Sequence, residues 1–79
     1  MSNIEIYDSA FMEVFQIEKA DLTDSLEYQS ISAWDSVGHM ALMAMLEDEF
    51  DIMLEMDDIV DFGSYKSGVK TLEKYGVKF

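Results

Sequence analysis

The feature that most constrains the fold of this chain is the run V-G-H-M-A-L-M-A-M-L at residues 37–46. It follows Asp35 and Ser36, two residue types favoured at helix N-termini, and it predicts a helix over about residues 36–50. A helix of a small domain usually has a polar face, but the first turns of this one are apolar nearly all round. We therefore expect some of its apolar residues to lie at or near the surface. The apolar residues left near the surface are candidates for a contact surface, namely Val37, Met40, Ala41 and Ala44.

A second helix is predicted near the start of the chain. Apolar residues recur there at three- and four-residue intervals between Ile4 and Ile17. Ser2 and Glu5 have the spacing of a capping box, in which each residue satisfies a backbone N–H of the other. The periodicity fades afterwards, and residues 18–34 read as a long loop held to the core at isolated apolar positions. A loop of this length is often functional.

The last third of the chain predicts two further helices. The segment D-D-I-V-D-F at residues 57–62 is consistent with a short third helix, and a fourth follows Ser64, with Gly76 as its C-cap. No segment shows the sustained alternation of a strand. The expected fold is all-α: one domain over residues 1–79, a four-helix bundle with a long first loop and a short third helix.

Charge and composition exclude several classes of function. The chain has a net charge of −12 at pH 7, which disfavours binding to nucleic acid and to anionic membrane surfaces. Eight of its acids lie in residues 47–61, where no basic residue occurs, so they form either a solvated face or a docking face for a basic partner. No apolar run approaches the ~20 residues that span a bilayer. We expect a monomeric cytoplasmic protein without a metal site. Because the chain has no cysteine, it has neither a disulfide nor a thiolate metal site.

Three roles are possible for Ser36: a helix cap, a hydrolytic nucleophile and an attachment point for a covalent group. As a helix cap it would compete with Asp35, which already fills that position well and leaves the serine hydroxyl directed outward. As a hydrolytic nucleophile it would use His39, three residues on, but no G-x-S-x-G turn and no independent third group is evident. As the attachment site of a prosthetic group it would hold a phosphodiester at a helix N-terminus, where unpaired N–H groups and the helix dipole favour negative charge. We do not expect an enzyme.

The sequence resembles the acyl carrier protein family. D-S-V at residues 35–37 resembles the family's D-S-L motif, and L-E-D-E-F-D-I at residues 46–52 resembles the acidic and aromatic end of the helix that follows it. The resemblance implies an acyl-carrier fold and 4′-phosphopantetheine from coenzyme A attached to Ser36 by a phosphopantetheinyl transferase. That enzyme would also contact Asp35 and Val37. The thiol at the end of this prosthetic group, which we call the arm, would carry acyl or aminoacyl groups as thioesters.

The resemblance also implies partner enzymes with basic docking patches. These are an acyl-loading ligase and acyl- or ketosynthase-type enzymes, docking on the second and third helices. The implied contact residues are Val37, Gly38, His39, Met40, Ala41, Ala44, Glu47, Asp48, Asp57 and Asp58. Carriers of fatty-acid synthesis usually have acids at the positions of Gly38 and Ala41. Trp34 and His39 make the segment more similar to stand-alone carriers of specialised biosynthesis, so we hypothesise a narrow set of partners.

Other interpretations remain open at the level of sequence. The chain is also similar to peptidyl or aminoacyl carriers, and an acidic helical adaptor without a prosthetic group would have the same charge, with Ser36 as a cap or a phosphorylation site. A calcium site is disfavoured, because D-E-F-D-I-M-L-E-M-D-D-I lacks the glycine and the terminal glutamate of an EF-hand loop. Met43 is expected in the core, while Met40 and Met45 fit either core or surface. Trp34 is either a loop anchor on the core or a wall beside the arm.

Overall fold

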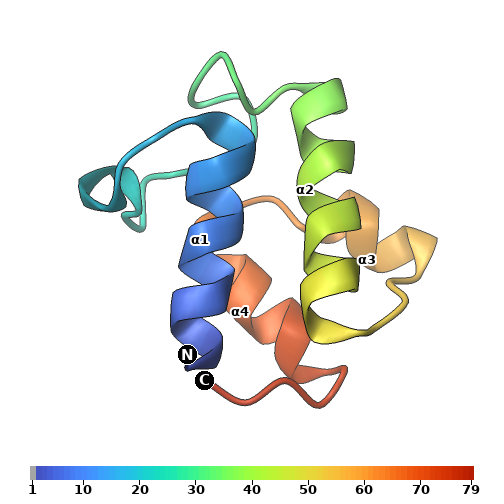
Figure 1. Ribbon diagram of the computed structural model, residues 1–79. Helices are drawn as coiled ribbons and strands as arrows, with labels where there is room; N and C mark the ends of the chain where they lie inside the picture. Colours follow the sequence, from blue (N-terminus) through green and yellow to red (C-terminus); the bar gives the residue numbers. More distant parts are fainter. Residues whose placement is uncertain (1) are drawn as a thin grey trace.

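A computed structural model of the chain, which describes residues 2–79, confirms the all-α prediction (Figure 1). Within that range it has four α-helices and no strand beyond one isolated antiparallel bridge between Glu27 and Ser64. The elements are α1 (Asn3–Phe15), a 3-10 turn η1 (Lys19–Asp21), α2 (Ser36–Phe50), α3 (Met56–Asp61) and α4 (Tyr65–Glu73). In Figure 1, α1 and α2 run side by side in opposite directions, with α3 beside α2. The two chain ends lie close together, and the Asn3 side-chain amide donates to the carbonyl of Lys78 at 2.9 Å.

The predicted capping box starts α1. The Ser2 hydroxyl accepts from the backbone N–H of Glu5, whose carboxylate accepts in return from the backbone N–H of Ser2 at 3.2 Å. The hydrogen bond from the Ser2 N–H, together with one that the Ser2 hydroxyl donates to the same carboxylate at 2.9 Å, lowers the pKa of the Glu5 carboxyl. The helix ends two residues before the predicted Ile17, because Gln16 adopts the left-handed conformation at φ 55° and terminates the ladder.

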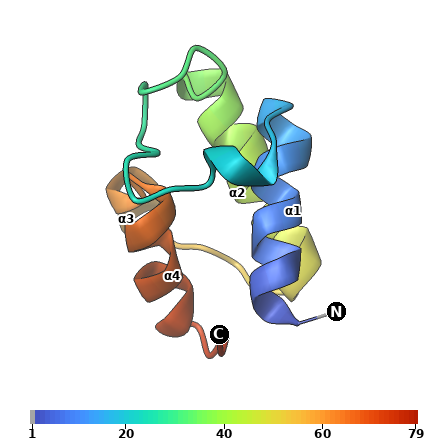
Figure 2. The same cartoon turned by 90° about the vertical axis from the view of Figure 1, so that its left-hand side faces the viewer.

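The predicted bounds of α2 are confirmed. Asp35 is the N-cap, and its carboxylate accepts from the backbone N–H of Gly38 at 2.8 Å. Asp51 ends the helix in the left-handed conformation. The connection from α1 is a long loop, as predicted, and it contains the short η1 turn (Figure 2). Leu26 and Trp34 are the residues of this loop that are buried in the core.

The prediction for the last two helices needs one correction. α3 begins at Met56, within one residue of the expected position, and α4 begins after its predicted N-cap Ser64, whose hydroxyl accepts from a backbone N–H at 2.9 Å. Gly76, however, is not the C-cap of α4. The helix ends earlier, at Glu73, and Gly76 lies in the turn that follows, at φ 89°, a conformation that favours glycine.

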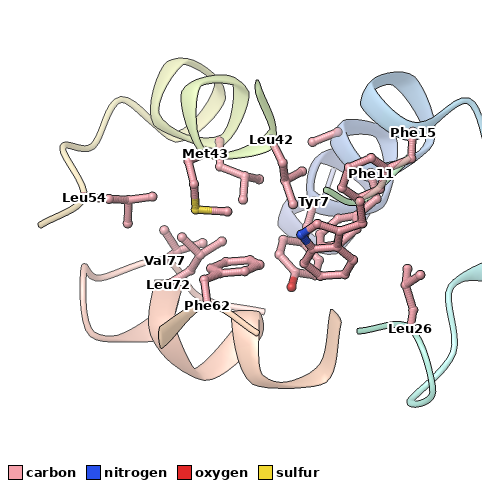
Figure 3. Close-up of a cluster of buried hydrophobic side chains, with 13 residues drawn as sticks. Tyr7, Phe11, Phe15, Leu26, Leu42, Met43, Leu54, Phe62, Leu72 and Val77 are labelled. Atoms are coloured by element: carbon pink, nitrogen blue, oxygen red, sulfur yellow. The ribbon is translucent and has the colours of Figure 1, made fainter. Parts of the chain in front are cut away.

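The core combines aromatic and aliphatic side chains that pack between the helices (Figure 3). Phe11 lies at its centre, with ring centroids 5.6 Å from Trp34 and 5.3 Å from Tyr65 in edge-to-face arrangements. Met43 is 1% exposed, as predicted for a core residue, whereas Met45 is half-buried at the edge. Among residues 2–79 no helix is both long and apolar enough to cross a bilayer.

Candidate functional site

Ser36 is the first residue of α2, and its side chain faces solvent. The N-cap role belongs to Asp35, so the serine hydroxyl is not used in the helix terminus. Its oxygen lies 3.0 Å from the phenol oxygen of Tyr28, a residue of the long loop. Ser36 therefore presents an accessible hydroxyl on a fixed helix end, with one phenol beside it.

A cavity opens directly beside this hydroxyl, between α2 and α3. Its volume is about 370 Å³, within the range of small-molecule pockets. The lining is mainly apolar, and it is formed by Tyr28, Ser36, His39, Met40, Met56, Ile59, Val60, Phe62 and Gly63. No lysine or carboxylate is part of it. The cavity suits an uncharged, partly apolar group, and the Ser36 hydroxyl is part of its lining.

His39 does not lie on the surface, contrary to its predicted role as a partner contact. Its side chain is 8% exposed, and both ring nitrogens have partners within the protein. The indole N–H of Trp34 donates to Nδ1 at 2.9 Å, so the ring proton is on Nε2, which donates to the carbonyl of Ile59 at 2.7 Å. His39 therefore joins the end of the long loop to α3 through α2, and Trp34 is a core anchor.

Gly38 has a role within the fold, and its predicted contact with a partner stays a prediction. A Cβ added there would overlap the carbonyl oxygen of Ala33, which belongs to the loop just before α2, and would crowd the ring of Phe15 at 3.3 Å. The glycine lets the loop backbone approach the first turn of the helix. This close approach, and not a need for flexibility, explains a glycine within α2.

The remaining apolar positions predicted on α2 are at the surface. Val37 is 79% exposed and Met40 is 51% exposed, and Ala41 and Ala44 are exposed as well. On α3, Met56 and Val60 are exposed beside the same cavity as Met40. We call Val37, Met40, Met56 and Val60 together the apolar α2–α3 face. A cluster of this kind around a cavity marks a contact site more often than an inert surface.

The predicted acidic contact residues divide into free and engaged carboxylates. Asp48 and Asp57 are exposed. Glu47 accepts from the backbone N–H of Leu54 at 2.8 Å and so supports the connection between α2 and α3. The other acids exposed along residues 47–61 are Glu49, Asp51, Glu55 and Asp61.

Asp58 is the second acid with an internal partner, and its predicted contact with a partner enzyme stays a prediction. It pairs with Lys74 at 2.5 Å and accepts from the phenol of Tyr75 at 2.5 Å. These two hydrogen bonds lower the pKa of the Asp58 carboxyl, and the carboxylate in turn raises the pKa of Lys74 and of Tyr75. The pair holds α3 against the end of α4.

Several residues that line the cavity are not predicted as site residues by the sequence, namely Tyr28, Met56, Ile59, Val60, Phe62 and Gly63. Tyr28 in particular lies in a loop into which no periodicity extends. Its position follows from the antiparallel bridge beside Ser64 and from the hydrogen bond of its N–H to the carbonyl of Gly63 at 2.9 Å. Within residues 2–79 no group of three or more His, Asp or Glu side chains is arranged to hold a metal ion. The chemistry available at the site is that of a hydroxyl, a phenol and an apolar cavity.

Comparison with protein-family models, with curated proteins and with solved structures found no match to this chain.

Proposed function

We propose that this protein is an acyl carrier protein that carries acyl or aminoacyl intermediates on 4′-phosphopantetheine attached to Ser36. The observation that carries the proposal is the placement of an accessible serine hydroxyl on the first turn of α2, at the mouth of an apolar cavity. A catalytic serine is not supported, because His39 uses both its nitrogens on Trp34 and Ile59 and is not available as a base.

The position of Ser36 suits the covalent step. In the modification Oγ gives its proton to a base of the transferase and bonds to the phosphorus that carries the pantetheine part of coenzyme A. The phosphorus–oxygen bond within the diphosphate breaks, and adenosine bisphosphate leaves with that oxygen. The product is a phosphodiester anion at a helix N-terminus, where the dipole of α2 stabilises negative charge. Asp35 holds the first turn in place through its hydrogen bond to Gly38, so the hydroxyl is presented to the transferase in a fixed position.

The cavity fits the group that the proposal requires. Its lining combines apolar side chains with the hydroxyls of Tyr28 and Ser36, which matches an arm that is polar at its phosphate and less polar towards its end. When bound, the arm supplies a thiol that carries cargo as a thioester, a group that the cysteine-free chain lacks.

The surface around the cavity supports docking of enzymes with basic patches. The apolar α2–α3 face would form the centre of such an interface, and exposed carboxylates such as Asp48 and Asp57 would lie around it. Carriers of fatty-acid synthesis usually have acids where this chain has Gly38 and Ala41. The uncharged Gly38 and Ala41 therefore favour a narrow set of partners, such as a ligase and synthases of a specialised pathway, over the enzymes of general fatty-acid synthesis.

The proposal is tested by intact mass after incubation with coenzyme A and a broad-specificity phosphopantetheinyl transferase. The wild-type chain is expected to gain the mass of one phosphopantetheinyl group, and Ser36→Ala is expected to gain none. Ser9→Ala removes an exposed hydroxyl of α1 and serves as the matched control that is still modified. A folded wild-type chain that gains no mass refutes the carrier and favours an acidic adaptor without a prosthetic group.

Asp35→Asn separates two roles of the carboxylate. Asparagine caps helices as well as aspartate does, so the free energy of unfolding should stay within ~0.5 kcal/mol of wild type. If the transferase binds the negative charge of the Asp35 carboxylate, the rate of modification falls roughly tenfold or more. A tenfold fall corresponds to the loss of ~1.4 kcal/mol of transition-state stabilisation. An unchanged rate would show that Asp35 acts only as a cap.

A further inference from the structure

Backbone hydrogen bonds of the long loop hold the phenol of Tyr28 beside Ser36. The Tyr28 N–H donates to the carbonyl of Gly63, and the next residue, Gln29, donates to the carbonyl of Trp34 at 2.8 Å. The loop is thus fixed both to the connection between α3 and α4 and to the start of α2. Although Tyr28 is 37% exposed, its main chain has little freedom to carry the ring away from Ser36.

The ring of Tyr28 is also oriented by its neighbour in the cavity. It meets the ring of His39 edge to face, with centroids 5.4 Å apart at 74°. His39 itself is fixed by its hydrogen bonds to Trp34 and Ile59. The phenol oxygen therefore has a defined position 3.0 Å from the Ser36 hydroxyl, on the side of the cavity.

No other side chain of residues 2–79 makes a hydrogen bond to the Ser36 hydroxyl. Basic residues are scarce around it, since residues 1–63 contain a single lysine, Lys19, and no arginine, and none lines the cavity. A phosphodiester on Ser36 needs hydrogen-bond donors for its charged oxygens. Besides the backbone N–H groups of the helix terminus, Tyr28 is the donor that the structure provides.

We propose that Tyr28 is a positioning residue for the prosthetic arm: its phenol donates to the phosphodiester on Ser36 and directs the arm into the cavity between α2 and α3. The inference rests on the carrier function proposed above. Once Ser36 is modified, its Oγ is an ester oxygen and a weak acceptor, whereas the non-bridging oxygens, one phosphorus atom further out, are charged. Hydrogen bonds to charged acceptors are about twice as strong as neutral ones, so the phenol transfers its hydrogen bond to them.

The test uses the modified protein and its Tyr28→Phe variant, which keeps the ring and its packing on His39 and loses only the hydroxyl. Tyr75→Phe is the matched control, because it also removes a hydrogen-bonded phenol, on Asp58 at the other side of α3. The readout is the ³¹P resonance of the phosphodiester. In Tyr28→Phe we expect it to move by more than its linewidth and to narrow as the arm becomes more mobile, and in Tyr75→Phe we expect it to stay in place.

The outcomes separate this inference from the proposed function. If wild type and Tyr28→Phe both gain one phosphopantetheinyl group and their ³¹P resonances coincide, Tyr28 does not hold the phosphodiester, although the carrier function stands. If wild type gains no mass, both proposals fail. Thermal unfolding of each modified protein identifies any ³¹P change that comes from a loss of folded structure, because such a change would accompany a lowered Tm.

Discussion

The hydrogen bond between Trp34 and His39 leads to a quantitative prediction. It joins the only tryptophan to the only histidine of the chain, and both side chains lie in the core. Trp34→Phe removes the indole N–H and leaves Nδ1 of His39 without a donor. A buried acceptor left unsatisfied costs ~1–3 kcal/mol, and the smaller ring adds the cost of a cavity. For 79 residues, a total stability of ~4–12 kcal/mol is typical, so the loss is a large part of it.

A double-mutant cycle isolates the hydrogen bond from the cavity. His39→Phe leaves the Trp34 indole N–H unpaired, whereas Trp34→Phe combined with His39→Phe removes both polar groups of the pair. The carbonyl of Ile59 loses its donor in both variants that lack His39, so this cost cancels. The sum of the free energies of unfolding lost in the two single variants should therefore exceed the free energy lost in the double variant by ~1–2 kcal/mol.

The four free energies of unfolding come from urea denaturation followed by far-ultraviolet circular dichroism, which does not depend on the removed tryptophan. Met53, which is 84% exposed, supplies the control: Met53→Ala combined with Trp34→Phe should be additive. If the Trp34 and His39 substitutions are also additive within ~0.3 kcal/mol, the hydrogen bond is not a coupled interaction and the reasoning is refuted.

Three further predictions concern stability. Gly38→Ala should lower the free energy of unfolding, measured by urea denaturation, by ~1–2 kcal/mol. The overlap of the new Cβ with the loop carbonyl outweighs the ~1 kcal/mol gain in helix propensity. Gly63→Ala is the control and should be near neutral, because a Cβ there meets nothing closer than 3.7 Å. Met43→Ala should cost ~2–5 kcal/mol as a core truncation, and a loss below ~1 kcal/mol would contradict its burial. The pKa of Asp58 is lowered and that of Lys74 is raised, so their ion pair stabilises the fold fully between the ordinary aspartate pKa of ~3.9 and the ordinary lysine pKa of ~10.4. The Tm difference between wild type and Asp58→Asn should therefore be constant near neutral pH. It should disappear as the solution is acidified through the lowered pKa of Asp58. A Tm difference that persists in acid would contradict the ion pair.

Much of the fold could be predicted because its signals are local. The capping box of Ser2 and Glu5, the N-cap Asp35 and the N-cap Ser64 all act within one helical turn, so the residues that start each helix are neighbours in the sequence. The sequence does not predict the exact end of α4, because the three residues after Glu73, the last of which is Gly76, form a hydrogen-bonded turn. Helix ends depend on such weak local competition.

The sequence by itself determined the helices, the exposed position of Ser36 at the start of α2 and the acidic character of the surface, because each follows from spacing or from charge. Only the tertiary structure decided that Tyr28 reaches Ser36, that His39 turns inward and that Asp58 is already paired. These contacts join residues of different elements, and their geometry depends on the path of a loop that has no periodicity. Helical spacing places a residue on a face of its helix, but the neighbouring elements determine whether that face meets solvent or the core.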